Sequence, residues 1–303
     1  MTESAAIPGH RHAGPWVFIA ALVVPALWGI YWVPLRALDG VAAAGPWATF
    51  VAVLVGALTM APFAWTGRHR IRASNPWALM SIGIGGVSFV LYSNGLLYGH
   101  VAVVILLFYL TPVWSVILAR VWLGWRGSVW RYAAIGIGLG GIALVLRGSH
   151  GGLPLPTTIG DWFGLASGIM WSISSTGLRT HVETNGVETN FVFCLGGALA
   201  ALVLALGLGG APPAVPAPAI PETALWIAVL GVGWWGASLA IFMWVARRME
   251  PTRLGILMMT EAIVGTISAA LFTAEPFGWI MAVGAVLVVA AAYLETRHES
   301  PAA

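Results

Sequence analysis

One acidic residue is placed where a carboxylate could do chemistry away from water. Glu261 lies in the stretch LMMTEAIVGT, residues 257–266, with apolar sequence on both sides. A lone carboxylate in such a segment is costly unless it is neutralised or paired, so these residues are usually functional. Two hypotheses remain open. Glu261 is a neutral group hydrogen-bonded across helices, the form that burial favours, or it carries a coupling proton or binds a substrate ammonium group.

Aromatic side chains in the apolar segments form a second set of candidates. Aromatic rings stack on apolar solutes and attract ammonium groups, so a cluster of them suits an amphipathic solute. For any single ring, packing in the core or against lipid is the competing interpretation. We predict a substrate cavity that includes Trp28, Tyr31, Trp32, Tyr92, Tyr109, Pro112, Trp171, Ser175, Trp235 and Met259.

Prolines within the apolar segments predict kinks. Pro112 has no N–H and frees the carbonyl of Phe108, four residues earlier, which lipid cannot satisfy but a cavity or a neighbouring helix can. Pro25 and Pro34 act in the same way in the first apolar segment, and we expect them to be hinges. Kinked helices between two repeats point to a substrate path, although a kink without function is an equally open interpretation.

The elements that must position these residues are membrane-spanning helices. The chain has 303 residues, of which 59% are hydrophobic and 8% charged, whereas an ordinary soluble domain has roughly 25% charged residues. A spanning helix needs about 20 apolar residues. The sequence predicts an all-α integral membrane protein with ten spans, at residues 16–38, 46–65, 77–98, 101–122, 130–147, 161–180, 189–209, 224–246, 251–273 and 278–295.

The arginines predict how these spans are oriented. All 14 basic residues are arginines, and with a cytoplasmic N-terminus twelve of them fall on the cytoplasmic side and only Arg36 and Arg147 outside. Cytoplasmic loops are typically rich in basic residues, and a missed span would reverse every later loop. We therefore expect both termini in the cytoplasm and the chain in the inner membrane.

The sequence contains an internal repeat. Residues 26–36, ALWGIYWVPLR, align with 169–179, IMWSISSTGLR, so that Trp28 meets Trp171 and Arg36 meets Arg179. A shift of 150 aligns 81–92 with 231–242 and 110–125 with 260–275. Five spans per repeat is an odd number, so the second copy enters the membrane from the opposite side, as in secondary transporters that work by alternating access.

The repeat defines the expected organisation of the chain. We predict two inverted five-helix repeats, at 16–147 and 161–295, around a central cavity. A linker at 148–160, a disordered cytoplasmic N-terminus at 1–15 and a cytoplasmic tail at 296–303 complete the chain.

Several motifs resemble those of a known family. LYGHVAVVILLFYLTPVWSVILARVWLGWR at 97–126, with ALWGIYW and GDWFGLASGIMWSIS at 160–174, is similar to the EamA-type members of the drug/metabolite transporter superfamily. The likeness covers nearly the whole chain, but Trp125 replaces a common glutamate and Ala262 a second-half proline. The aromatic content looks most like the branch that exports aromatic amino acids, so the resemblance implies an amino-acid exporter.

The expected function is secondary export of amino acids, aromatic and others, with export of drugs or other small metabolites as the alternative. An intramembrane enzyme would need convergent acids, histidines or a metal cluster, and Glu261 is the only acid expected near mid-span. We expect no catalytic residue, metal site, cofactor or nucleic-acid partner. The expected partners are a small-molecule substrate and the lipid bilayer, with protons as a second solute if transport is coupled.

Overall fold

A computed structural model describes residues 15–42, 44–123, 129–150, 155–177, 184–249, 251–275 and 277–297. Trp125, Arg179, most of the expected terminal segments 1–15 and 296–303, and part of the linker 148–160 lie outside these residues. The regular structure within the described ranges is helical: α1 (Pro15–Gly29), α2 (Trp32–Ala42), α3 (Pro46–Thr66), α4 (Arg68–Ala73), α5 (Pro76–Tyr98), α6 (Val101–Phe108), α7 (Thr111–Leu123), α8 (Val129–His150), α9 (Ile159–Gly177), α10 (Gly186–Leu208), η1 (Ala217–Ala219), α11 (Ile220–Ala228), η2 (Val229–Ser238), α12 (Leu239–Ala246), α13 (Pro251–Phe272) and α14 (Trp279–Arg297).

Eight helical segments of the described chain are long and apolar enough to cross a membrane. They are Pro15–Ala42, Pro46–Thr66, Pro76–Tyr98, Val101–Leu118, Tyr132–Ser149, Gly186–Leu208, Ala217–Ala246 and Arg253–Phe272. Helices α9 and α14 occupy the other two expected spans, but α9 is interrupted by polar residues and the apolar part of α14 covers only Trp279–Leu294. The count of ten spans therefore stays a prediction.

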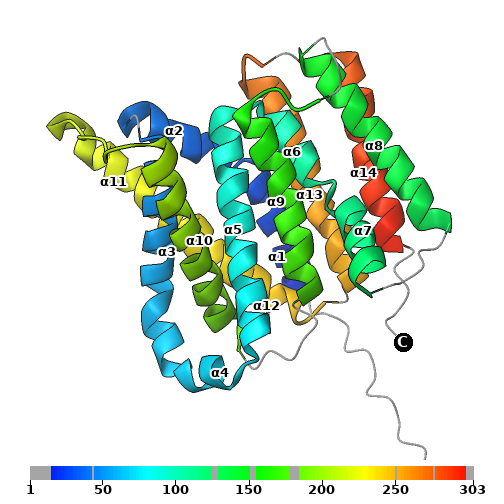
Figure 1. Cartoon of the computed structure of the whole chain (residues 1–303). Helices are drawn as coiled ribbons and strands as arrows, with labels where there is room; N and C mark the ends of the chain where they lie inside the picture. The colour runs from blue at the N-terminus through cyan, green and yellow to red at the C-terminus, as the bar shows by residue number, and fades with distance from the viewer. Residues whose placement is uncertain are drawn as a thin grey trace, which may run out of the picture.

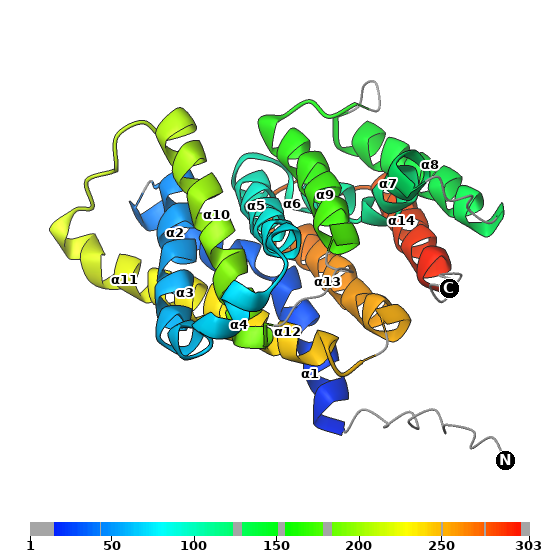
Figure 2. The ribbon, with the colours of Figure 1, turned by 60° about the horizontal axis from the view of Figure 1, so that its bottom comes forward.

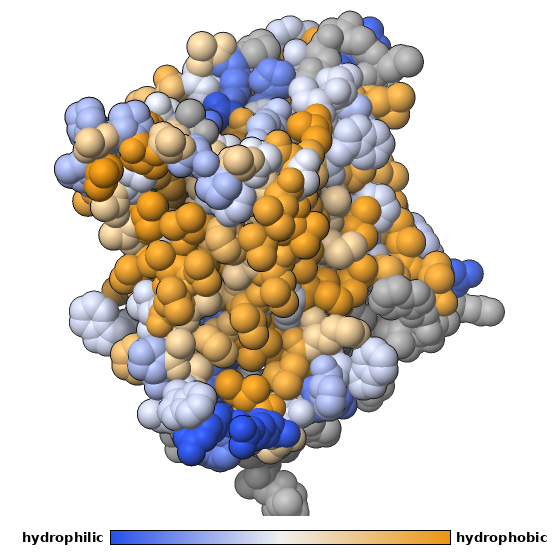
Figure 3. All heavy atoms as spheres, turned by 60° about the vertical axis from the view of Figure 1, so that its left-hand side comes forward, coloured by the Kyte–Doolittle hydropathy of each residue, from blue (hydrophilic) through white to orange (hydrophobic). Residues whose placement is uncertain are grey.

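The surface has the pattern that a bilayer requires. Apolar side chains form a band around the middle of the face in Figure 3, and polar side chains gather at both ends. Leu58 of α3 is 61% exposed, and Leu199 and Val203 of α10 are 63% and 69% exposed. Large apolar surfaces are rare on soluble monomers, so this band is where lipid would contact the protein.

The first expected span is broken near its middle. A turn at Ile30 and Tyr31 separates α1 from α2 (Figure 1). Pro34 has no N–H, so the carbonyl of Ile30 accepts instead from the backbone N of Val33 at 3.0 Å. Pro25 lies buried within the continuous helix α1.

The fourth expected span is broken at Tyr109 and Leu110, between α6 and α7. Pro112 frees the carbonyl of Phe108, and the hydroxyl of Thr111 donates to that carbonyl at 2.6 Å. The partner is thus a local side chain. The equivalent helix of the second half, α13, is continuous through Ala262.

Equivalent helices of the two halves run antiparallel. Trp47 at the start of α3 donates to the carbonyl of Gly210 just after α10, at 3.3 Å, and Arg70 just after α3 pairs with Glu188 at the start of α10. A Cβ at Gly138 of α8 would lie 3.4 Å from Ala291 of α14.

The same relation holds at the other end of α8 and in the third pair, α6 with α13. A Cβ at Gly148 would lie 3.2 Å from the backbone N of Met281. The backbone N of Val101, at the start of α6, donates to Glu275 after the end of α13, at 2.7 Å. This antiparallel pairing is what repeats of opposite orientation require.

The two halves interleave in space. Helices α8 and α14 pack together at one edge of the bundle, and α3, α10 and α11 lie at the opposite edge (Figure 2). Between these edges, α1 packs on α13, α5 on α9, and α6 on both α9 and α13. The centre of the protein is therefore built from helices of both halves.

Candidate functional site

The described side chains surround a narrow central cavity, and the space free of protein atoms, counted together with its part open to solvent, is about 310 Å³. The first half supplies residues from α1, the following turn and α5, and the second half supplies residues from η2, α12 and α13. The lining consists of Trp28, Tyr31, Phe89, Tyr92, Trp234, Trp235, Leu239 and Glu261. Each half contributes four of these eight residues, so the cavity lies on the boundary between the repeats.

Glu261 is held by tyrosines of the other half. Its side chain is 2% exposed, the hydroxyl of Tyr92 donates to Oε1 at 3.0 Å, and the hydroxyl of Tyr109 lies 3.2 Å from Oε2. The lining contains no arginine, lysine or histidine to balance a negative charge. The carboxyl group therefore has hydrogen-bond partners but no cationic partner in the cavity wall.

Tyr109 lets this site accommodate either charge state of Glu261. Its single hydroxyl hydrogen has two acceptors, the Met258 carbonyl at 2.6 Å and Glu261 Oε2 at 3.2 Å. If the hydrogen points to Met258, the Tyr109 oxygen can accept a hydrogen from a neutral carboxyl group. If it points to Glu261, two tyrosine hydroxyls donate to a carboxylate. Both hypotheses for Glu261 remain compatible with this geometry.

Phe89 is the centre of the aromatic cluster beside Glu261. Its ring centroid lies 5.5 Å from that of Trp28 and 5.3 Å from that of Trp171. The rings of Phe193, also at 5.3 Å, and Tyr92, at 6.3 Å, complete its surroundings. The two repeat-equivalent tryptophans thus pack on the same phenylalanine, one from each half.

A chain of hydrogen bonds fixes the orientation of the other rings. Trp28 Nε1 donates to Ser238 Oγ at 2.9 Å. Trp235 Nε1 donates to the Tyr31 hydroxyl at 3.1 Å, and that hydroxyl lies 3.1 Å from Ser93 Oγ. Both tryptophan bonds join one half of the chain to the other, so the cavity wall is tied together across the boundary.

The wall formed by the second half is a ten-residue π-helix, η2. The π-helical turns are rare and often occur at functional sites. Asn190 of α10 supports this one, because its Nδ2 donates to the carbonyls of Trp235 at 2.9 Å and Gly236 at 3.0 Å.

The structure brings together five of the predicted site residues: Trp28, Tyr31, Tyr92, Trp235 and Glu261. Trp171 packs on the cluster through Phe89. Tyr109 reaches Glu261 with its hydroxyl, but with Pro112 it also lines a second, apolar cavity of about 250 Å³ between α7, α8 and α14.

Besides Trp171, Tyr109 and Pro112, three more predicted residues lie outside the lining of the central cavity. Trp32 Nε1 donates to Ser268 Oγ at 3.0 Å and ties α2 to α13. Ser175 donates to the Ser172 carbonyl of its own helix at 3.1 Å. Met259 is buried on α13 but is not part of the cavity wall.

Three lining residues were not predicted from the sequence: Phe89, Trp234 and Leu239. The repeat contained a signal for two of them, since Phe89 and Leu239 are 150 residues apart, which is the shift that aligns the third and eighth expected spans. Trp234 has no aromatic counterpart, because the same shift pairs it with Ile84.

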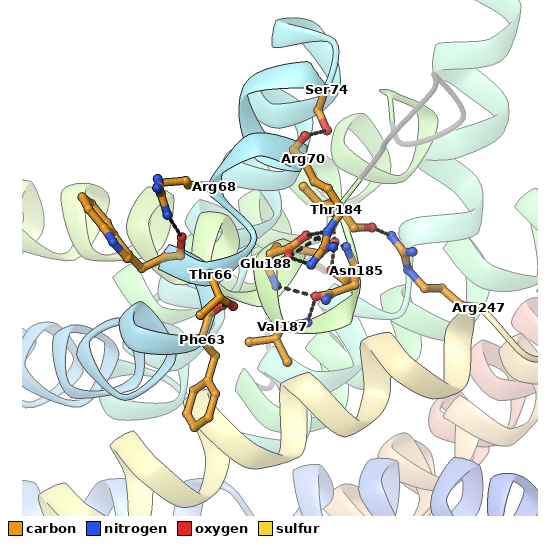
Figure 4. Close-up of polar contacts among 12 residues, drawn as sticks. Phe63, Thr66, Arg68, Arg70, Ser74, Thr184, Asn185, Val187, Glu188 and Arg247 are labelled. Carbon is orange, nitrogen blue, oxygen red and sulfur yellow. Dashed lines mark hydrogen bonds and ion pairs between the residues drawn. The ribbon is translucent and has the colours of Figure 1, made fainter.

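Ion pairs join the halves at both ends of the bundle. At one end, Arg70 of α4 binds Glu188, with Nε 3.0 Å from both carboxylate oxygens (Figure 4). This hydrogen bonding to Glu188 raises the pKa of the Arg70 guanidinium. At the other end, Arg36 Nη1 lies 2.8 Å from Glu275 Oε1.

At the end of the bundle that holds Arg70 and Glu188, a helix cap also fixes the start of α10. Asn185 accepts hydrogen bonds from the backbone N of Val187 at 3.0 Å and of Glu188 at 3.1 Å, and Glu188 Oε2 accepts from the Asn185 backbone N at 2.9 Å. Arg247 reaches the same corner by donating to the Thr184 carbonyl (Figure 4), and partial burial lowers its pKa. The start of α10 is therefore fixed to both α4 and the end of α12.

Comparison with known proteins identifies the family. The model of the EamA-like transporter family matches residues 15–147 and again residues 158–297, which together make up most of the chain. The chain belongs to the EamA-like transporter family. Members of this family are membrane transporters rather than enzymes, so this EamA chain is a multi-pass membrane transporter with a small-molecule substrate.

A solved structure shares the fold of this EamA transporter. This structure, described as "Crystal structure of protein", is 20% identical to the chain, has a TM-score of 0.59, and covers 94% of this chain and 99% of its own. At that identity the similarity concerns the fold alone. No curated protein matches the sequence.

Proposed function

We propose that this EamA-family transporter is a secondary exporter of amino acids, aromatic and others, that works by alternating access. The solute sits in the central cavity, with its ammonium group toward Glu261 and its side chain among the aromatic rings. The finer assignments proposed with it are ten spans, both termini in the cytoplasm and a location in the inner membrane, as the arginine distribution predicts.

One observation carries the choice of solute. Glu261 is a buried acid without a cationic partner in the cavity wall, and it faces aromatic rings of both halves. Carboxylates pair with ammonium groups, and aromatic faces attract them. A phosphorylated or other strongly anionic solute would need basic residues that this lining lacks.

The arrangement of the halves supports alternating access. The cavity lies on their boundary, equivalent helices run antiparallel, and an ion pair joins the halves at each end. Opening one end while the other stays paired would expose the cavity to one side at a time. Transport is either uncoupled or driven by protons carried on Glu261.

Transport by the purified protein tests this proposal. Liposomes containing only this chain are loaded with labelled phenylalanine, leucine or serine, and efflux is compared with that from empty liposomes. We expect faster efflux of phenylalanine and leucine, with Glu261→Gln slowing it. Absence of efflux for every amino acid, while another small metabolite or drug is transported, would replace the proposal by the alternative substrate class.

A further inference from the structure

Among the side chains that line the central cavity, Trp234 carries the one buried polar atom without a hydrogen-bond partner in the described residues. Its Nε1 is buried and has no hydrogen-bond partner among the described residues. The other polar side chains of the wall each bond within the protein: Trp28 to Ser238, Tyr31 to Ser93, Trp235 to Tyr31, and Tyr92 to Glu261.

Such a donor is unusual in a native structure. Buried N–H groups nearly always have a partner, and an exception calls for an explanation such as a missing ligand. The adjacent residue shows the contrast, since Trp235 lines the same cavity and its Nε1 donates to Tyr31 at 3.1 Å. The ring centroid of Trp234 lies 6.1 Å from that of Tyr31, so the Trp234 ring belongs to the same aromatic wall.

We propose that the Nε1–H of Trp234 binds the carboxylate of the solute, while Glu261 binds its ammonium group. This deepens the proposed function and rests on it, because it explains how a cavity without basic residues selects a zwitterion over a simple amine. An indole N–H is a donor only, so it suits an anionic acceptor and cannot bind an ammonium group. Trp234 thus becomes a specificity-determining residue.

The test compares two solutes that differ only in the carboxylate. Phenylalanine and phenethylamine share the ring and the ammonium group, and their transport constants are measured in the same liposomes. Trp234→Phe keeps an aromatic ring and removes the N–H. Because a hydrogen bond to a charged group is lost, we expect KM for phenylalanine to rise about tenfold, and KM for phenethylamine to change little.

Trp28→Phe is the matched control. It also removes an indole N–H from the wall, but that N–H is already bonded to Ser238. Trp28→Phe should change the KM of both solutes by the same factor and leave the ratio of the two KM values unchanged. Trp234→Tyr, which restores a donor, should recover part of the ratio. If Trp234→Phe does not fold, Trp234→Met removes the same donor with a flexible apolar side chain.

The possible outcomes separate this inference from the proposed function. A KM ratio that is unchanged in Trp234→Phe, or changed equally in Trp28→Phe, overturns the role of Trp234 and leaves amino-acid export standing. If the wild type transports phenethylamine better than phenylalanine, the cavity has no site that binds the carboxylate, and the inference is wrong. Transport of neither solute by the wild type, with other metabolites transported, contradicts the proposed function and the inference with it.

Discussion

Arg36 and Glu275 form an ion pair of 2.8 Å that joins the first half of the chain to the second. The pair is built into the backbone on both sides. Arg36 also donates to the carbonyls of Leu96 and Gly99, at 2.9 and 2.8 Å, and Glu275 accepts from the backbone N of Val101 at 2.7 Å. It therefore holds α2, the start of α6 and the end of α13 together.

Removing the charge of Glu275 should open this end of the protein. In Glu275→Gln the amide can still accept from Val101, but the attraction to Arg36 is lost. Leu239 lines the central cavity, so a cysteine there reports access to it. In a Cys194→Ala background, we expect Leu239→Cys to react faster with a membrane-impermeant thiol reagent, added on the Arg36 side, when Glu275→Gln is present than when Glu275 is kept. The control is Glu222→Gln, because that carboxylate is exposed and accepts a hydrogen bond from Trp226 of its own helix, at 3.4 Å. Equal labelling in both variants would show that the pair does not restrain this end.

At the opposite end, we expect the two partners of an ion pair to respond unequally. The side chain of Glu188 is 1% exposed and that of Arg70 is 40% exposed. Arg70→Gln leaves a buried carboxylate without its cation, whereas Glu188→Gln leaves an arginine that water can solvate. Thermal unfolding in detergent should show a larger drop in unfolding temperature for Arg70→Gln than for Glu188→Gln. Equal losses would mean that the pair is hydrated rather than buried.

Glu261 should control any dependence of transport on pH. Glu261→Gln has nearly the same shape but no ionisable group, and glutamine can still accept from Tyr92. If Glu261 carries the coupling proton, efflux driven by a pH gradient is lost and exchange at equal pH is retained. Tyr92→Phe serves as the comparison, since it keeps the carboxyl group. A pH profile that is the same in wild type and Glu261→Gln would show that Glu261 does not carry a coupling proton.

Gly29 should not tolerate a side chain. A Cβ there would lie 2.7 Å from the backbone N of Gly265 and 2.8 Å from the carbonyl of Glu261, so α1 and α13 would have to separate. Overpacking of this kind costs about 1–3 kcal/mol, and we expect Gly29→Ala to lower the unfolding temperature accordingly. Gly136→Ala on α8 meets nothing within 4 Å and should be neutral or slightly stabilising. A neutral Gly29→Ala would show that the two helices can move apart without loss.

The sequence by itself determined the features that are encoded locally. The family, the two repeats and the apolar helices follow from patterns along the chain, which hydrophobicity and repeat spacing record directly. Pro34 and Pro112 also marked the helix breaks, because a missing N–H frees the carbonyl four residues earlier, whereas Pro25 lies in a helix that continues past it. Glu261 was identifiable for the same reason: a carboxylate in an apolar segment is exceptional in any environment.

Only the tertiary structure decided which side chains meet. The cavity brings together residues more than 200 positions apart, such as Trp28 and Leu239, and no local pattern specifies which face of each helix turns inward. Trp32 and Pro112 were plausible lining residues by type and depth, yet packing turns one toward Ser268 and places the other in a separate apolar cavity. The unpaired N–H of Trp234 likewise exists only in three dimensions, because whether a donor has a partner depends on helices that fold against it from both halves.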